Sequence, residues 1–161
     1  MLQVLDIVEG TTVDGPGLRT SIYLAGCKHH CPGCHNPQSW DFAAGKPMSQ
    51  DEIMAVVREN DFNVTLSGGD PMYMAEEVAG LCRRIKAELH KTIWCYTGFV
   101  WEDLVGNPDY MPLLETIDVL VDGPFVMARR DISLRFRGSG NQRVIDVRKS
   151  LEAGSVVMAE Y

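Results

Sequence analysis

The sequence of 161 residues lacks the features that mark membrane, secreted and nucleic-acid-binding proteins. No apolar run approaches the length of a membrane span, and residues 1–6 have neither the basic start nor the apolar centre of a signal peptide. The net charge of −7 speaks against general binding to nucleic acids or to anionic membranes. We therefore expect a cytoplasmic protein whose partners include neither nucleic acid nor membrane.

The chain also lacks a disulfide framework, a linker, an internal repeat and a low-complexity segment. Three of its five cysteines are crowded into eight residues, which is not the pattern of a secreted disulfide scaffold. Hydrophobic residues make up 45% of the chain and charged residues 23%, which is ordinary for a globular protein. These totals predict one domain over residues 1–161 with a single substantial core.

The crowded cysteines are Cys27, Cys31 and Cys34, with the spacing C-x3-C-x2-C. Pro32 and Gly33 disfavour a helix here, so we expect a tight loop whose thiols point at a common centre. Thiolates are the favoured ligands of soft metals and of iron–sulfur clusters. Three cysteines would hold three irons of a cubane [4Fe–4S] cluster and leave the fourth iron open to a non-protein ligand.

Other interpretations of this loop stay open at this point. A structural zinc site of the Cys3His type, in an interaction module, would take its fourth ligand from His29, His30 or His35. Residues 31–34 also have the spacing of a thioredoxin-like redox dithiol. A plain electron-transfer ferredoxin would need a fourth cysteine, and the two that remain, Cys82 and Cys95, lie in core-like positions.

Hydrophobic periodicity predicts alternating strands and helices. We expect strands over residues 2–8, 20–25, 63–67, 92–96, 117–121 and 143–147, and an edge element over 156–159. A capping box at residues 49–52 predicts a helix, and amphipathic patterns predict others over 75–90, 100–105 and 110–115. A complete eight-unit barrel needs about 250 residues. We therefore predict an α/β fold that is a partial, open TIM-like barrel of about six parallel strands with outer helices.

Turn motifs follow several of the predicted strands: residues 68–71 (Gly-Gly-Asp-Pro), 97–98 (Thr-Gly) and 122–123 (Asp-Gly). In a plain turn, Asp70 would be a helix N-cap. In a ligand site, Gly68 and Gly69 would let the backbone approach a ligand, and their carbonyls with Asp70 would receive an ammonium group. In a parallel sheet all these strand ends meet at one rim with the cysteine loop.

Basic residues gather toward the end of the chain. From Arg129 to Lys149 there are seven basic and two acidic residues, a local net charge of +5 in an acidic protein. One interpretation is a solvated face without a specific role. The other is a docking surface for an acidic partner, or a phosphate contact.

These motifs resemble those of a known family. The cysteine spacing is that of radical S-adenosylmethionine (SAM) enzymes, and residues 14–19 resemble the segment that precedes the cluster in activases of glycyl-radical enzymes. Residues 66–71, 119–125 and 137–143 resemble the branch that acts on anaerobic (class III) ribonucleoside-triphosphate reductase. The resemblance covers nearly the whole chain. It departs at Gly33, where many radical SAM enzymes have an aromatic residue, and at His35, where many members of the branch have tyrosine.

The resemblance implies an oxidoreductase in which Cys27, Cys31 and Cys34 hold a [4Fe–4S] cluster whose open iron is chelated by SAM. The cluster, reduced by a one-electron donor such as flavodoxin, would cleave SAM to a 5′-deoxyadenosyl radical. That radical would take hydrogen from a glycine in the large reductase subunit, with no general acid or base. The candidate cofactor contacts are Gly33, Cys34, His35, Gly68, Gly69, Asp70, Thr97 and Asp122.

Within this list, residues 68–70 match the family motif for the SAM ammonium group, and Thr97 and Asp122 are chosen for their position at strand ends. Two enzymatic alternatives remain: a radical SAM enzyme that acts on a small molecule, and the activase of another glycyl-radical enzyme such as pyruvate formate-lyase. The segments from residue 119 onward favour the reductase activase.

Overall fold

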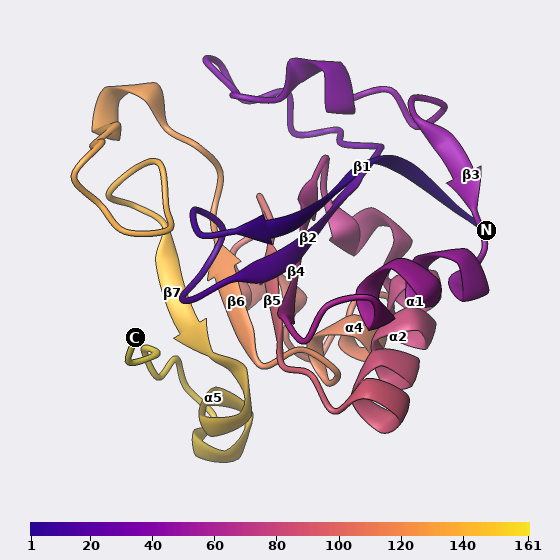
Figure 1. Cartoon of the computed structure of the whole chain (residues 1–161). Coiled ribbons are helices and arrows are strands. Elements are labelled where there is room, and N and C mark those ends of the chain that lie inside the picture. Colours follow the sequence, from indigo (N-terminus) through magenta and orange to yellow (C-terminus); the bar gives the residue numbers. More distant parts are fainter.

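The computed structural model describes residues 1–161 and shows a seven-stranded mixed sheet with its main helices on one side (Figure 1). The strands are β1 (Leu2–Thr11), β2 (Arg19–Leu24), β3 (Lys46–Met48), β4 (Asn63–Gly68), β5 (Ile93–Tyr96), β6 (Val119–Asp122) and β7 (Arg143–Asp146). Their order across the sheet is β3-β1-β2-β4-β5-β6-β7, so β3 and β7 are the outermost strands, do not pair with each other and leave the sheet unclosed.

The strand directions confirm the α/β class but correct the expected pattern. Strands β2, β4, β5 and β6 run parallel, whereas the pairs β3–β1, β1–β2 and β6–β7 are antiparallel. The sheet therefore has seven strands with four in parallel, rather than about six parallel strands. The connection over residues 12–18 is too short for the crossover that a parallel β1–β2 pair would need, and it forms a hairpin instead.

The helices are α1 (Gln50–Arg58), α2 (Ala75–Arg84), α3 (Trp101–Leu104), α4 (Met111–Leu114) and α5 (Val147–Ala153). Helix α1 begins at the predicted capping box: Ser49 Oγ accepts from the Glu52 amide at 3.1 Å, and the Ser49 amide donates to the Glu52 carboxylate at 3.2 Å. The helix predicted over residues 75–90 is α2 continued by a π-turn, η3 (Ile85–Leu89), which ends at His90 in a left-handed conformation.

Two elements were not predicted. Strand β3 has three residues and includes Pro47, which lacks an amide donor, so it carries no strand pattern of its own. Helix α5 follows β7 directly, with Asp146 as its N-cap, and the apolar run over residues 144–147 conceals that boundary. The expected edge element over 156–159 is confirmed as a single bridge between Ile145 and Met158.

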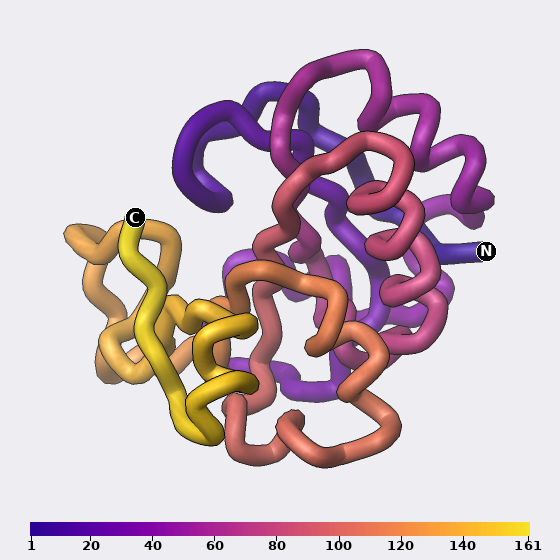
Figure 2. The backbone as a smooth tube through the Cα atoms, turned by 90° about the horizontal axis from the view of Figure 1, so that it is seen from below, coloured from indigo at the N-terminus to yellow at the C-terminus, as the bar shows by residue number.

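The core lies between the sheet and the helices. Alternate residues of the central strands, such as Ile22, Leu66 and Ile93, face the apolar stripe of α2 in a cluster of 27 buried residues. Cys82 and Cys95 belong to this cluster and are fully buried, as predicted. Figure 2 shows α1 and α2 on one side of the molecule and the C-terminal segment on the other.

The opposite face of the sheet has no large helix over it. Here the alternate residues of β2, β4 and β5 are polar or aromatic, whereas β6 and β7 contribute Val121 and Val144. Trp94 packs edge-to-face against Phe136, with ring centroids 5.4 Å apart, and against Tyr161 at 6.0 Å. The carboxyl ends of the four parallel strands meet at one edge of the sheet, which is where the cysteine loop begins. No helix in the structure has the length and apolar composition needed to cross a lipid bilayer.

Candidate iron–sulfur centre

The cysteine loop leaves the end of β2 and is held by backbone hydrogen bonds on both sides. The amides of Gly26 and Cys27 donate to the carbonyls of Ser39 and Trp40 at 2.7 Å and 3.2 Å. The second half of the motif is a tight turn in which the Cys34 amide donates to the Cys31 carbonyl at 3.0 Å. Pro32 and Gly33 occupy its centre.

Gly33 has a φ of +75°, so the turn matches the type II pattern of proline followed by a residue in the left-handed region. A Cβ atom at Gly33 would collide with the side chain of Met127, and it would lie 3.3 Å from the ring of Phe125. The departure from the family pattern at this position therefore has a structural reason. The space that an aromatic residue would take is filled by side chains from the segment after β6.

Each of the three histidines near the cysteines packs against an aromatic ring, and one of them also contacts a carboxylate. His29 Nε2 lies 2.6 Å from Asp70 Oδ2, and its ring packs edge-on against Phe99. His30 stacks on Trp40 with ring centroids 4.4 Å apart. His35 lies against Phe125 with ring centroids 5.0 Å apart.

Gly68 and Gly69 form the contact between β4 and the start of the cysteine loop. The Gly69 amide donates to the Leu24 carbonyl at 2.7 Å, and the Asp70 amide donates to the Gly26 carbonyl at 2.9 Å. A Cβ atom at Gly69 would lie 2.5 Å from the oxygen of Gly26, and one at Gly68 would collide with the backbone of Leu24. Only glycine fits at these two positions, because backbone packs directly on backbone.

Asp70 is fully buried and accepts four hydrogen bonds. Its Oδ1 accepts from the Met72 amide at 3.0 Å, which is the predicted N-cap contact, opening the turn η2 (Pro71–Met74). Its Oδ2 accepts from Thr97 Oγ1 at 3.0 Å and from the Gly98 amide at 2.9 Å, and it contacts His29. The carboxylate therefore ties the end of β4 to the end of β5 and to the cysteine loop.

A cavity of about 390 Å³, the cysteine cavity, contains the second half of the motif. Its lining includes Cys31, Cys34 and His35, together with aromatic and basic side chains from residues 125–137. The Asn36 amide donates to the Cys34 sulfur at 3.4 Å. Arg137 also lines the cavity; its Nη1 donates to the Gln142 carbonyl at 2.5 Å, but its buried Nε has no partner.

Cys27 lies outside that lining. Burial raises the pKa of the Cys27 thiol to about 11, and the charges of Asp70, Cys31 and Cys34 add to the increase, whereas a hydrogen bond from the His29 backbone amide lowers it. The three thiols thus belong to one loop but are not assembled: no group of three cysteine, histidine or carboxylate side chains forms a ready-made metal site.

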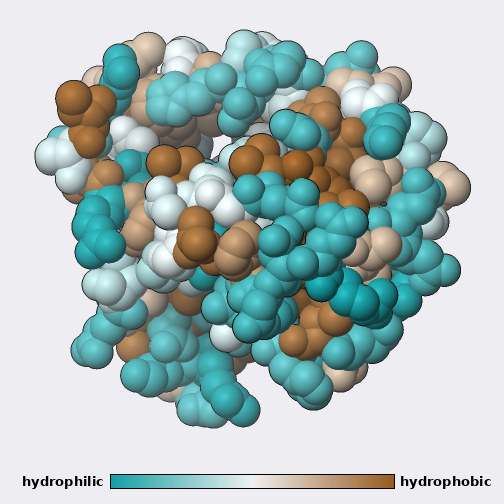
Figure 3. Space-filling view, viewed as in Figure 1, coloured by the Kyte–Doolittle hydropathy of each residue, from teal (hydrophilic) through white to brown (hydrophobic).

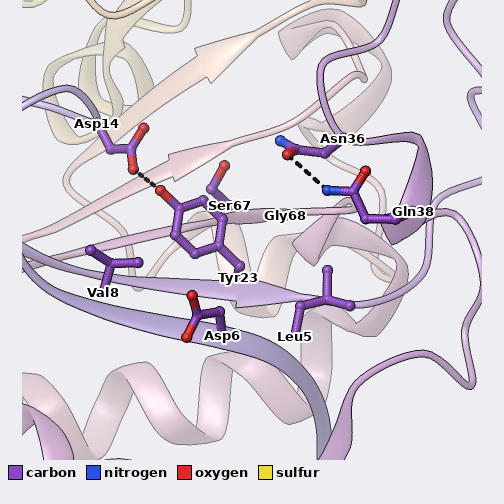
Figure 4. A pocket seen from close by; sticks show the side chains of 9 residues that line it. All are labelled: Leu5, Asp6, Val8, Asp14, Tyr23, Asn36, Gln38, Ser67 and Gly68. Atoms are coloured by element: carbon purple, nitrogen blue, oxygen red, sulfur yellow. Dashed lines mark hydrogen bonds between the residues drawn. The ribbon is translucent and has the colours of Figure 1, made fainter.

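A second cavity of about 550 Å³, the β1–β2 cavity, adjoins the cysteine cavity and shares Asp14, Asn36 and Ser67 with it. In Figure 4, Asp14 and Tyr23 point toward each other across this cavity, and Gly68 lies at its border. Asp14 accepts hydrogen bonds from the Tyr23 hydroxyl and from Ser21 Oγ, the latter at 3.0 Å. Figure 3 shows a hollow below the upper edge of this face, with hydrophilic residues above it and hydrophobic residues on both sides.

Asp122 is the last residue of β6, at the same edge of the sheet, but it is held by other partners. Its carboxylate pairs with Arg143, with Oδ2 2.6 Å from Nη2, and accepts from the Trp101 amide at 2.9 Å. Arg143 also contacts Glu102 at 2.6 Å, and the hydrogen bond from Arg143 to Asp122 raises the pKa of its guanidinium. The structure therefore joins Asp70 to Thr97 and places His35 with Cys34, whereas Asp122 belongs to a separate ion pair.

Comparison with known proteins bears on the identity of this site. Residues 13–145 match a family model described as a 4Fe-4S single cluster domain. The anaerobic ribonucleoside-triphosphate reductase-activating protein of Salmonella typhimurium is 38% identical over 145 residues, covering 84% of this chain and 93% of the relative. The chain belongs to this family of activating proteins. The protein of the same name from Escherichia coli is 39% identical over 150 residues with the same coverage, and that of Enterobacteria phage T4 is 32% identical over 139 residues, covering 82% and 86%.

The site of this family member has donors that suit an iron–sulfur cluster. All five cysteines are free thiols, and the three in the loop are partly exposed, whereas Cys82 and Cys95 are buried. Thiolates are the ligands that such clusters need. The orphaned Nε of Arg137 points to an anionic group in the cysteine cavity, because a buried donor without a partner is costly.

Sequence reasoning missed several residues of this site. Asp14 was considered only as the first residue of the segment that resembles the activases, although its side chain lines both cavities. His29 was weighed only as a zinc ligand, and Arg137 only as one of many basic residues. The polar alternation of Ser21 with Tyr23 in β2 was the one local signal that could have marked the open face of the sheet.

Proposed function

We propose that this chain activates an anaerobic ribonucleoside-triphosphate reductase by generating a glycyl radical on its large subunit, with a [4Fe–4S] cluster and SAM as cofactors. One observation carries the proposal: three free thiols lie in one loop at the carboxyl edge of the parallel strands, in a chain that is 38% identical to a named activating protein over 84% of its length. Parallel α/β sheets hold their ligands at this edge.

The fold proposed for this function is the partial barrel of radical SAM enzymes, formed by residues 1–161 as one domain. Support comes from four parallel strands covered by helices on one face only. The polar and aromatic face would be the inside of the barrel. The absence of pairing between β3 and β7 leaves that inside accessible to a loop of a large partner.

The cluster ligands would be Cys27, Cys31 and Cys34. Bound there and reduced, the cluster would supply the one electron that cleavage of the sulfonium C–S bond of SAM requires. The residues of this chain would bind and orient the cofactors. His35 borders the cysteine cavity, where Arg137 would offer its unpartnered Nε to an anionic group, and Gly33 shapes the turn between Cys31 and Cys34.

The SAM ammonium group is assigned to the backbone at Gly68 and Gly69, beside the β1–β2 cavity. Asp70 and Thr97 would support that backbone, since their side chains already bond to each other at 3.0 Å. The carboxylate of Asp122 would not bind SAM, because it is paired with Arg143. Asp122 would only help to shape the end of β6. Entry of the partner's glycine loop would close both cavities to water, which matters because a carbon radical attacks whatever lies nearby.

The proposal extends to the partners and the compartment. The large reductase subunit would supply the glycine, and a one-electron donor such as flavodoxin would reduce the cluster. Five free cysteines suit the reducing cytoplasm, where thiols are kept reduced.

The proposal is tested by mixing the iron-loaded protein, SAM and a reductant with an anaerobic reductase under exclusion of oxygen. An organic radical signal in electron paramagnetic resonance (EPR), with the doublet splitting of a glycyl radical on the large subunit, is expected. Its absence with the reductase, combined with activity on pyruvate formate-lyase, would assign the chain to another glycyl-radical enzyme. A matched sample with Cys31→Ser should give no radical.

A further inference from the structure

His29 and Asp70 form a contact within the site that the binding of an iron–sulfur cluster does not by itself require. His29 Nε2 lies 2.6 Å from Asp70 Oδ2, and the side chains of the two residues are 17% and 1% exposed. The two residues are 41 positions apart in sequence. The contact therefore joins the cysteine loop to the end of β4.

The acceptor is held rigidly. The Asp70 carboxylate accepts hydrogen bonds from the Met72 amide, the Gly98 amide and the Thr97 hydroxyl. These three donors fix its position. A fully buried carboxylate is tolerated only when its hydrogen-bonding capacity is used. His29 is its fourth partner and the only one that comes from the cysteine loop.

The space for the imidazole is also built by other residues. The ring of His29 lies 4.6 Å from that of Phe99 and 5.4 Å from that of Tyr73, measured between centroids. A Cβ atom at Gly98 would lie 2.5 Å from His29 Cδ2, so only glycine allows the ring to reach Asp70. The next residue, His30, has a φ of +48° and stacks on Trp40, which points its ring away from this pocket.

We propose that His29 is a positioning residue that holds Cys27 in place by anchoring the first half of the cysteine loop to Asp70. Cys27 lies two residues before His29, so a contact that fixes the His29 side chain limits the positions that the Cys27 thiol can take. The side chain of one residue thus fixes the first half of the loop. The role of Cys27 as a cluster ligand rests on the proposed function, whereas its anchoring by His29 does not.

The anchoring is tested first without iron. Two substitutions separate the hydrogen bond from the packing: His29→Phe keeps an aromatic ring and loses the donor, and His29→Gln keeps a donor near the position of Nε2. The rate of alkylation of each cysteine by iodoacetamide is measured by mass spectrometry. Hydrogen bonds to charged groups contribute enough stability for a change of about tenfold in a local opening equilibrium.

We expect His29→Phe to increase the alkylation rate of Cys27 by about tenfold and that of Cys34 by less than about twofold. His29→Gln should restore most of the protection. The control is His30→Asn, which tolerates the same left-handed backbone and should leave Cys27 as in the parent protein. Equal rates at Cys27 in the parent protein and His29→Phe would overturn the inference, as would a parallel increase at Cys27, Cys34 and buried Cys95.

A second readout uses the protein reconstituted with iron and sulfide. His29→Phe should broaden the EPR signal of the reduced cluster, because an unanchored ligand samples several geometries, and His29→Gln should narrow it again. An unchanged line shape in His29→Phe would contradict the inference. Failure of the parent protein itself to take up iron would contradict the proposed function and leave the alkylation result to decide on the anchor.

Discussion

Arg19 is buried to 2% exposure and has no carboxylate partner. Its Nε donates to Thr65 Oγ1 at 2.8 Å, and its Nη2 and Nη1 donate to the carbonyls of Val64 at 2.9 Å and of Pro16 at 3.3 Å. Its guanidinium lies over the ring of Trp94 at 5.5 Å, and burial lowers its pKa. A planar cation with several donors can satisfy these three acceptors, so Arg19, together with Asp14, fixes the hairpin loop to the open face of the sheet.

The cysteines of the loop and those of the core are expected to have different roles. Cys31→Ser should lose most of the bound iron, because a serine hydroxyl is a poor replacement for a thiolate ligand. Cys82→Ser should keep the iron and lose about 1–3 kcal/mol of unfolding free energy, because it buries a hydroxyl in the core. Iron content and urea unfolding are measured on both variants. Retained iron in Cys31→Ser, or its loss in Cys82→Ser, would refute the ligand assignment.

Burial of Cys82 predicts a pH dependence of stability. Burial raises the pKa of this thiol from 9.0 to about 12, and a hydrogen bond with Thr116 opposes the increase. The unfolded chain then loses this proton at lower pH than the folded chain, so stability falls as pH rises above 9. One proton corresponds to about 1.4 kcal/mol per pH unit. Between pH 9 and 10.5, the unfolding free energy of iron-free Cys82→Ala, measured in urea, should fall less steeply with pH than that of the iron-free parent protein, by about that amount. Equal slopes in the two proteins would contradict a buried neutral thiol.

At the scale of elements, the contact between β4 and the cysteine loop depends on two glycines. The sequence predicted both the strand over residues 63–67 and the turn after it, and it placed Asp70 as an N-cap. It could not show that the same carboxylate reaches Thr97 and His29, because that contact depends on the relative positions of three strand ends. The glycines were assigned to a ligand approach, and the structure adds a packing reason for them.

Gly69→Ala tests this packing. The new Cβ would lie 2.5 Å from the Gly26 oxygen, so the loop must shift, and we expect a loss of about 1–3 kcal/mol of unfolding free energy together with less bound iron. The matched control is Gly80→Ala in α2, whose Cβ meets only the movable end of Gln50 at 2.9 Å. Helix propensity favours that change by up to about 1 kcal/mol. Equal iron content and stability in Gly69→Ala and the parent protein would disprove the close contact.

Over the whole molecule, alternating strands and helices were predictable because apolar periodicity reports local structure. The direction of β1, the strand β3 and the helix α5 were not, because they follow from short connections and from edges that carry little pattern. The open face was inferred only from chain length. Its aromatic cover by Phe136 and Tyr161 comes from segments that are distant in sequence.

In the structure, the basic residues between Arg129 and Lys149 fall into two groups, those that form ion pairs and those that do not. Arg143 is committed to Asp122 and Glu102, and Arg148 lies 3.9 Å from Glu152, whereas Arg129 and Arg130 are exposed and form no ion pair. These two belong to the segment that supplies the aromatic lining of the cysteine cavity. A partner that docks at the cavity would meet their charge.

Reversal of both charges, Arg129→Glu with Arg130→Glu, should therefore weaken binding of the large reductase subunit and leave SAM cleavage without the reductase unchanged. A loss of about tenfold in affinity corresponds to two lost surface charge contacts of moderate strength. The control reverses Arg148 and Lys149 to glutamate, which changes net charge equally on α5. Equal binding by the two double variants would remove the docking role, and loss of SAM cleavage would place Arg129 and Arg130 in the active site.

The central claim is that Cys27, Cys31 and Cys34 hold a cluster with one iron open to SAM. The most direct measurement is anaerobic reconstitution with iron and sulfide, reduction, and EPR before and after addition of SAM, with an assay for 5′-deoxyadenosine. We expect about four irons for each chain, as a cubane cluster requires. The EPR signal should change with SAM, and 5′-deoxyadenosine should form. A colourless protein that binds one zinc and does not respond to SAM would contradict the claim.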